Sequence, residues 1–260
     1  RNMSGGINLY NTQYRYVGQF TQESQGGSLT FGLPIGRGFT RMFTAYSYER
    51  VRVTELNEAY ADDDLALRNP FLADALLLNQ NGQRIVSQIT PSIVHNTVDQ
   101  PIFPTTGRRL SASIDIAGLG GNTSFFKPTL ESVFFFRQNA RMSLGFRARW
   151  EHVKGYKDTV DLPIFERLFL GGEYDIRGFD IRTIGPQDPE TGLVLGGNKS
   201  LLFNVEQIFT IAPPVRLILF YDAGQVQPGP QRDADGVILP GKDFAMNDFK
   251  TSTGAEIRFF

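Results

Sequence analysis

The stretch RMSLGFRARWEH, residues 141–152, alternates apolar and polar side chains along its whole length. Its apolar positions are Met142, Leu144, Phe146, Ala148 and Trp150, and its polar or small positions are Arg141, Ser143, Gly145, Arg147, Arg149 and Glu151. Successive side chains of a β-strand point to opposite faces, so this pattern predicts a strand with one apolar and one polar face. Its length matches the roughly 9–11 residues of a tilted membrane-spanning strand, whereas strands of soluble proteins centre on about 5–6 residues.

The same alternation recurs along the chain. It is clear at residues 108–118, 201–209, 215–224 and 249–260, and weaker at residues 6–16, 28–35, 39–53, 85–97 and 124–137. Aromatic residues concentrate near the ends of these stretches, where the interfacial girdles of a membrane barrel lie. The sequence therefore predicts an all-β fold of about ten strands, a transmembrane antiparallel β-barrel in which residues 1–260 form one segment.

The composition is compatible with this fold and excludes several others. None of the 260 residues is cysteine, which rules out a disulfide framework and a thiolate metal site. The formal net charge of -1 predicts no nucleic-acid partner. No window approaches 18 consecutive apolar residues, so a transmembrane helix is not expected. The opening RNMSGGINLYN has no apolar core, so no signal peptide is predicted.

The links between the expected strands differ in length. Short links occur at residues 34–38, 118–122, 137–141 and 212–215, and long ones at about 54–84, 153–199 and 226–248. A barrel with tight turns at one end and long loops at the other produces this contrast, so we expect 54–84 to be a long extracellular loop. Within it, DDDLALRNPFLADALLL (residues 62–78) predicts a short helix on or outside the barrel.

The longest loop, about 153–199, contains a glycine-punctuated segment, RLFLGGEYDIRGFDIRTIGP. In it Arg177 is followed by Gly178, which bends freely, and by the aromatic Phe179. A loop folded into the lumen could use this combination if Arg177 formed bidentate bonds to a carboxylate on the wall. Glu206 and Asp222 are candidate acceptors, because both fall on the polar faces of the strands after the loop. The alternative is that Arg177 is a solvated loop residue.

Three motifs resemble those of one family, the BamA-like outer-membrane protein assembly factors. LGGEYDIRGFDIRTIGP (170–186) resembles its signature loop, with a Val-or-Ile, Arg, Gly, Phe-or-Tyr motif. VDQPIFPTTGRRLSASID (98–115) resembles its Asp-x-x-x-x-Phe-Pro-Thr-x-Gly turn and the strand after it. LILFYDAGQV (217–226) resembles its Phe-x-Asp-Ala-Gly-x-Val strand, and STGAEIRFF (252–260) resembles the next strand. The order and spacing also match.

The resemblance covers essentially the whole chain and aligns it with roughly strands five to fourteen of a sixteen-stranded barrel. We therefore expect a portion of a larger barrel, without the first four strands, the last two strands and the periplasmic POTRA repeats. A closed barrel of ten strands remains the alternative.

The resemblance also implies a function, the assembly and insertion of β-barrel proteins into an outer membrane without nucleotide or other cofactor. Arg177 would be the latch of a loop inside the lumen, Gly178 its bend and Phe179 its packing anchor, with Glu206 and Asp222 as acceptors on the wall. The implied partners are unfolded outer-membrane protein clients, the lipid bilayer, accessory lipoproteins and periplasmic chaperones. The implied location is the outer membrane, as an integral protein.

Two other transport functions stay open. A polypeptide-translocating pore of the same superfamily, of the two-partner secretion type, shares much of this motif set. A passive porin-like channel would suit inward faces rich in Arg, Glu, Ser and Gly, but it would not need the segment 167–186.

An enzymatic function and a metal site are not predicted. A hydrolase needs a Ser/His pair with an orienting group, and only His95 and His152 are available, without a Gly-x-Ser-x-Gly elbow. His152 continues the apolar register of Trp150, which favours an interfacial position. Asp62, Asp63 and Asp64 could offer oxygen ligands to Ca²⁺, but no spaced ligand pattern follows them, so a solvated loop is favoured.

Overall fold

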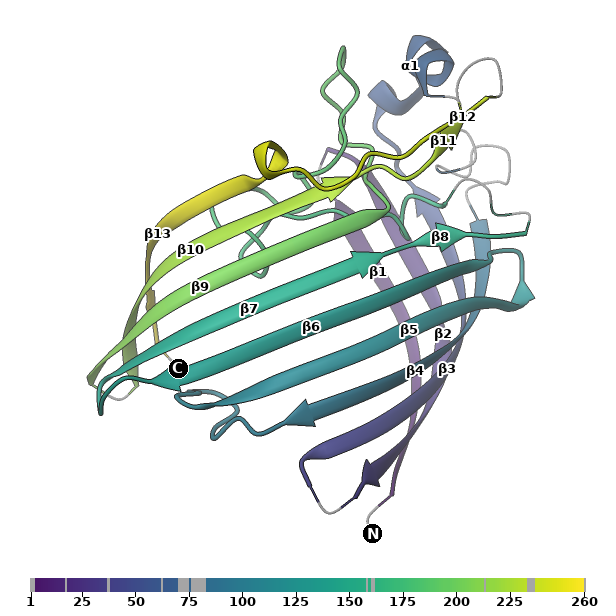
Figure 1. Ribbon diagram of the computed structural model, residues 1–260. Coiled ribbons are helices and arrows are strands. Elements are labelled where there is room, and N and C mark those ends of the chain that lie inside the picture. Colours follow the sequence, from purple (N-terminus) through teal and green to yellow (C-terminus); the bar gives the residue numbers. More distant parts are fainter. Residues whose placement is uncertain are drawn as a thin grey trace.

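A computed structural model of the chain shows one large antiparallel sheet (Figure 1). It describes residues 3–16, 18–36, 38–61, 63–69, 75, 83–157, 159, 162–212, 214–232 and 237–259. The long strands are β1 (Ser4–Tyr16), β2 (Phe20–Ile35), β3 (Thr40–Thr54), β4 (Gln83–Asn96), β5 (Gly107–Gly121), β6 (Phe125–Arg137), β7 (Met142–His152), β9 (Lys199–Ala212), β10 (Val215–Gln227) and β13 (Lys250–Arg258).

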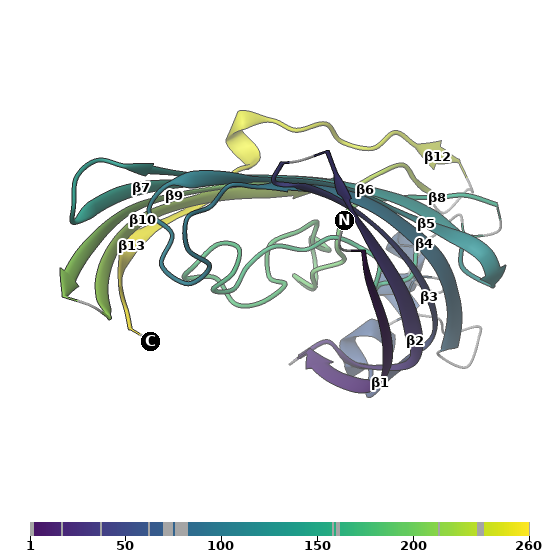
Figure 2. The same cartoon turned by 90° about the horizontal axis from the view of Figure 1, so that it is seen from below.

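Each long strand pairs antiparallel with the next along the chain, so the sheet order follows the sequence from β1 to β13. The short strand β8 (Lys154–Gly155) follows β7 and pairs with β6, while β11 (Gln231–Arg232) and β12 (Ile238–Leu239) form a separate hairpin. This arrangement confirms the predicted all-β, antiparallel architecture. The sheet does not close in this chain, and β1 and β13 lie at its two edges (Figure 2).

The alternation in the sequence becomes two chemically different faces of a curved sheet. In register across the sheet, Arg147 pairs with Asn204, Asn204 with Asp222, and Asp222 with Ser252, which forms a polar row on one face. One residue earlier on β7, Phe146 starts the corresponding row on the other face. Figure 2 shows the sheet curved around the face on which the loop between β7 and β9 lies. The polar rows therefore line the concave face, and the apolar rows lie on the convex, membrane-facing side.

Several strands are longer than their patterns predicted, and the largest extension is that of β2. Alternation indicated a strand from residue 28, but β2 begins at Phe20. Between Phe20 and residue 28, polar side chains such as Glu23 and Gln25 occupy the convex face, so the contrast between faces disappears. Phe20 itself is buried in an apolar cluster on the concave side. This end of β2 extends past the apolar band, where periodicity carries no signal.

Strands β3, β7 and β10, which precede the three long connections, all finish at one end of the sheet (Figure 1). Strands β1 and β5 finish at that end too and are followed by short links to β2 and β6, so tight turns are not confined to the opposite end. Within the first connection, the expected short helix is present as α1 (Asp63–Arg68), preceded by the 3-10 turn η1 (Glu58–Ala61).

The helix α1 packs onto other segments at the loop end of the sheet (Figure 1). Leu65 is fully buried against a cluster that includes Phe20 and Ile164. Asp62 and most of residues 70–82 lie outside the described residues. In the part of the chain that the structure describes, no helix is long and apolar enough to cross a membrane.

The main apolar core lies between the concave face and the 153–198 loop. Sheet residues of this core include Val51, Val86, Phe125 and Leu202, and its loop residues include Leu168, Leu170, Ile176 and Ile184. Burying a side chain of this size contributes about 1.5–3 kcal/mol. The loop is therefore a folded element that an apolar core holds against the sheet. The concave face is apolar near the loop end and polar further along the strands.

Candidate functional site

The loop between β7 and β9 runs back over the concave face instead of extending away from the sheet (Figure 2). Isolated bridges pair Leu168 with Gly197 and Leu170 with Ile184, which folds the loop on itself. Gly171 and Gly172 adopt positive φ angles of 112° and 98°, a region that glycine tolerates best. The segment after these glycines carries Arg177 to the polar part of the wall.

Arg177 forms the centre of the site. Its Nε and Nη2 atoms donate to the two oxygens of Asp222, at 2.8 Å each, in a bidentate pair. Its Nη1 atom donates to Glu206 Oε1 at 2.8 Å and to Glu256 Oε2 at 2.9 Å. The backbone N–H of Arg177 also donates to Asp222, at 3.1 Å. Three adjacent strands, β9, β10 and β13, thus contribute one carboxylate each.

Both predicted acceptors, Glu206 and Asp222, therefore contact Arg177, and a third acceptor was missed. Glu256 lies on the polar face of β13, and this position in the alternation could have identified it. The ring of Phe220 is a further missed contact, because its centroid lies 3.7 Å from the guanidinium carbon of Arg177. A cation over an aromatic face is attracted by the ring quadrupole.

The site is largely withdrawn from solvent. The Asp222 side chain has no exposed surface, and that of Arg177 is 13% exposed. Burial by itself disfavours a charged guanidinium, but the hydrogen bonds that Arg177 donates to Asp222 and the charges of Glu206 and Asp222 outweigh it and raise the pKa of Arg177. The guanidinium stays charged, and four of its five N–H groups are used by carboxylates.

The two residues after Arg177 differ in what they contribute. Gly178 has a φ of 83°, and a Cβ atom there would lie 3.3 Å from the Ser252 hydroxyl, so a bend at this position suits glycine. Phe179 is partly buried against the main core. Ile176, on the other side of Arg177, is fully buried and packs more deeply than Phe179. The sequence interpretation assigned the packing role to the aromatic residue and missed the isoleucine.

Strand β7 binds the loop immediately before Arg177. Arg149 Nη2 donates to the Asp175 carboxylate at 2.8 Å, and Arg147 Nη1 donates to the backbone oxygen of Tyr174 at 2.6 Å. Asn204 donates both to the Asp175 backbone oxygen and to the Asp222 carboxylate. The loop and the wall therefore share one continuous network of charged and polar groups across β7, β9, β10 and β13.

A second loop–wall ion pair lies away from this network. Lys127 of β6 contacts the Glu166 carboxylate at 3.2 Å, and both side chains are largely buried. No sequence motif pointed to this pair. It joins the beginning of the loop to the middle of the sheet.

The opposite end of the concave face is occupied by the β4–β5 turn, residues 97–106. Arg216 of β10 donates to the backbone oxygens of Phe103 and Pro104, at 3.1 Å and 3.4 Å, and stacks over the Phe103 ring. Within the turn, burial acts to raise the pKa of Asp99, but hydrogen bonds from Thr105 and neighbouring backbone N–H groups hold it at about 2. The turn is thus ordered and reaches across the sheet to β10.

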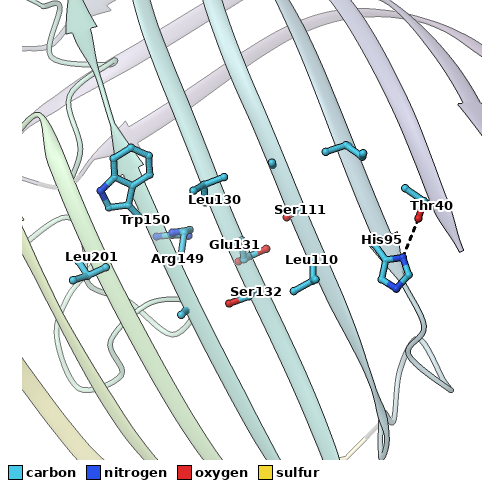
Figure 3. Close-up of a pocket in the computed structure, with 13 residues that line it drawn as sticks. Thr40, His95, Leu110, Ser111, Leu130, Glu131, Ser132, Arg149, Trp150 and Leu201 are labelled. Carbon is cyan, nitrogen blue, oxygen red and sulfur yellow. Dashed lines mark hydrogen bonds between the residues drawn. The ribbon is translucent and has the colours of Figure 1, made fainter. Parts of the chain in front are cut away.

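The two histidines lie among residues of the convex side. A hollow of about 530 Å³ is lined there by apolar side chains such as Leu110, Leu130 and Trp150, together with His95 (Figure 3). His95 Nδ1 lies 2.9 Å from the hydroxyl of Thr40. His152 stacks on Trp150 with ring centroids 6.3 Å apart. Among the described residues, no group of three or more His, Asp or Glu side chains could hold a metal ion.

The chain is similar to proteins of one superfamily. The family model of the Omp85 superfamily domain matches residues 2–259. The outer membrane protein assembly factor BamA of Nitratidesulfovibrio vulgaris is 28% identical over 227 residues, which are 85% of this chain and 27% of that protein. BamA of Neisseria meningitidis serogroup B is 31% identical over 177 residues, 63% of this chain and 22% of that protein. This chain thus spans about a quarter of the length of these relatives.

A eukaryotic protein and a solved structure are also similar. A SAM50-like protein of Drosophila melanogaster is 30% identical over 150 residues, 57% of this chain and 34% of that protein. The crystal structure of BamA from Haemophilus ducreyi lacking POTRA domains 1-3 has a TM-score of 0.70 at 18% identity, covering 87% of this chain and 47% of that one. At this identity the structural likeness concerns the fold. The family match over nearly its whole length and the BamA relatives, with this fold, show that the chain is a BamA-like β-barrel segment of an integral outer-membrane protein and belongs to the Omp85 superfamily.

Proposed function

We propose that this chain is part of the barrel of a factor that assembles and inserts β-barrel proteins into an outer membrane, with Arg177 as the latch of its inner loop. The BamA and SAM50-like relatives support the assembly function. One observation carries the latch: a single, largely buried guanidinium binds carboxylates from three adjacent strands. A solvated loop arginine would not need such partners.

The latch sets the position of the loop relative to β9, β10 and β13. Because all three acceptors come from neighbouring strands, the bound guanidinium also draws those strands together on the concave side. Gly178 provides the bend, while Ile176 and Phe179 pack beside the charged network. This part of the wall is therefore stiff, and strand separation during assembly takes place elsewhere in the barrel.

Unfolded outer-membrane chains are the proposed clients, and the lipid bilayer is the medium in which they are inserted. Unpaired strand edges are costly in hydrocarbon, so a client strand needs a temporary partner while its own barrel closes. Accessory lipoproteins and periplasmic chaperones are proposed as further partners on the family resemblance alone.

The test uses the full-length protein in liposomes, with an unfolded client barrel whose heat-modifiability and protease resistance report insertion. Wild-type protein is expected to accelerate insertion, and Arg177→Ala to slow it. Arg109→Ala serves as a matched control, because the exposed Arg109 of β5 has no hydrogen bond or ion pair with any described side chain.

Two results would contradict the proposal. If wild-type protein leaves client insertion unchanged but passes an unfolded soluble polypeptide or small solutes, the chain belongs to a translocation pore or a channel. If Arg177→Ala inserts clients as fast as Arg109→Ala and wild type, assembly stands but the latch does not.

A further inference from the structure

A second arginine of the loop, Arg182, lies in a cage of aromatic rings. Its guanidinium carbon is 3.6 Å from the ring centroid of Phe169, 4.4 Å from that of Tyr16 and 5.5 Å from that of Phe20. The ring centroids of Tyr16 and Phe20 are 5.1 Å apart, so these two rings also contact one another. A desolvated cation over several ring faces is a strong case of cation–π attraction.

Among the described residues, the polar contacts of Arg182 include no carboxylate. Nε donates to Gln19 Oε1 at 3.4 Å, and Nη2 donates to the backbone oxygen of Ile164 at 3.3 Å. Burial lowers the pKa of Arg182 to about 10, which is still far above neutral pH. Arg182 is therefore a partly buried cation that is compensated by ring faces and neutral oxygens.

The backbone at Arg182 is also unusual. Its φ of 63° lies in the left-handed region, which residues with a side chain rarely adopt. The turn is closed by Thr183, whose backbone N–H and hydroxyl both donate to the Asp180 backbone oxygen. An unfavourable backbone angle persists where the surrounding contacts over-determine it. Here the conformation directs the side chain away from the Arg177 network and toward the other end of the sheet.

The two arginines bind opposite ends of the strand order. Arg177 contacts β9, β10 and β13, whereas Arg182 contacts Tyr16 at the end of β1, Phe20 at the start of β2 and Gln19 in the turn between them. In Figure 2 the loop crosses the concavity between these two regions. Arg177 and Arg182, only five positions apart in the sequence, thus contact strands at opposite ends of the sheet.

We infer that Arg182 is a positioning residue, the second anchor of the inner loop, and that it couples the β1–β2 end of the sheet to the β9–β13 end. The two anchors make the loop a link between the β1–β2 and β9–β13 regions, because displacement of either region must break an anchor or move the loop. This inference rests on the proposed role of the loop and adds an aromatic attachment to the ionic one. Arg182 is held by aromatic ring faces, whereas Arg177 is held by carboxylates.

The test measures distances in the full-length protein in liposomes by pulsed electron resonance between two spin labels. These 260 residues contain no cysteine, so labels can be introduced at exposed positions among them, Asp180 of the loop, Gln25 of β2 and Thr251 of β13, after any cysteine elsewhere in the full-length protein has been replaced. In Arg182→Ala, the Asp180–Gln25 distribution is expected to broaden about twofold, because the loop loses its contact with that wall. The Asp180–Thr251 distribution should stay as narrow as in wild type.

Two substitutions of Tyr16, a wall residue of the cage, separate ring attraction from plain packing. Tyr16→Leu removes the ring but fills much of its volume and is expected to broaden the Asp180–Gln25 distribution as Arg182→Ala does. Tyr16→Phe retains the ring face and is expected to behave as wild type. If Arg182→Ala fails to fold, Tyr16→Leu alone decides the matter.

The inference is overturned if the Asp180–Gln25 distribution is unchanged in Arg182→Ala, or if Tyr16→Leu is indistinguishable from Tyr16→Phe. A role limited to stability would lower the unfolding temperature of the variants without selectively broadening one of the two distributions. These measurements require no client, so their failure is distinguishable from failure of the assembly function.

Discussion

The two anchors of the inner loop use the same side chain in opposite environments. Around Arg177 are three carboxylates and one ring, and all come from adjacent strands at one end of the sheet. Around Arg182 are three rings and two neutral oxygens, from the loop itself and the first two strands. The first anchor is an ionic network, and the second is an aromatic cage.

The difference teaches how a buried cation can be held on a membrane-protein wall. Carboxylates compensate the charge fully, but they are themselves costly to bury if the arginine leaves. Aromatic faces compensate it only partly, yet they leave no unpaired charge behind when the contact breaks. We therefore expect removal of Arg177 to be more damaging than removal of Arg182.

The largest expected effect is that of Arg177→Ala. It leaves the fully buried Asp222 carboxylate without its main partner and is expected to destabilise the protein by about 3–5 kcal/mol, as for other broken buried pairs. Urea unfolding in liposomes, followed by heat-modifiability, measures the change. Arg109→Ala should change the stability by less than about 0.5 kcal/mol. A loss below about 1 kcal/mol for Arg177→Ala would place the pair among weak surface bridges.

Next in size is Arg177→Lys. Lysine keeps the charge but cannot form the bidentate pair with Asp222 while reaching Glu206 and Glu256, so a loss of about 1.5–3 kcal/mol is expected from the charged hydrogen bonds. The same unfolding measurement applies. Equal stability of Arg177→Lys and wild type would show that charge alone holds this anchor.

A smaller effect is expected for Arg182→Ala, about 1–2 kcal/mol from the lost ring contacts. The double variant Arg177→Ala/Arg182→Ala then tests independence, because the two guanidinium groups share no partner among the described residues. Their effects should add within about 0.5 kcal/mol. A larger coupling would mean that the loop transmits strain between the anchors.

The smallest expected effect is that of salt. Raising the ionic strength from about 0.1 to 1 M shortens the Debye length from about 10 to 3 Å. The stability difference between wild type and Arg177→Ala should shrink slightly, since the network is only partly screened, while that between wild type and Arg182→Ala should not change. Unfolding at both salt concentrations checks this, and equal salt dependence of the two differences would erase the distinction between the anchors.

The ionic anchor could be predicted from the sequence, whereas the aromatic cage could not. Strand alternation assigns Glu206 and Asp222 to one face, and the same argument would have assigned Glu256 to it. The partners of Arg182 lie in three segments that no motif connects, and two of them flank the β1–β2 turn. Their proximity depends on how the loop crosses the concavity, which is a property of the folded sheet.

The limits of the fold prediction have a similar physical cause. Alternation reports burial on one face only, so it fails where both faces meet similar surroundings, as in β2 between Phe20 and residue 28. It also fails to show that the concave face turns apolar near the loop end, where Val51 and Leu202 meet the loop. On a strand, an apolar residue facing a folded loop looks the same in sequence as one facing lipid.

The wall beneath Arg177 has a consequence for ions. On β9, β10 and β13 it carries three carboxylates, and the guanidinium of Arg258 contacts two of them, Glu206 and Glu256. With the loop in place, Arg177 adds a positive charge to these carboxylates; withdrawal of the loop would remove that charge and make this surface more negative. Any water-filled path along it would then concentrate cations and repel anions. Movement of the loop would therefore register electrically, as a change in ion selectivity.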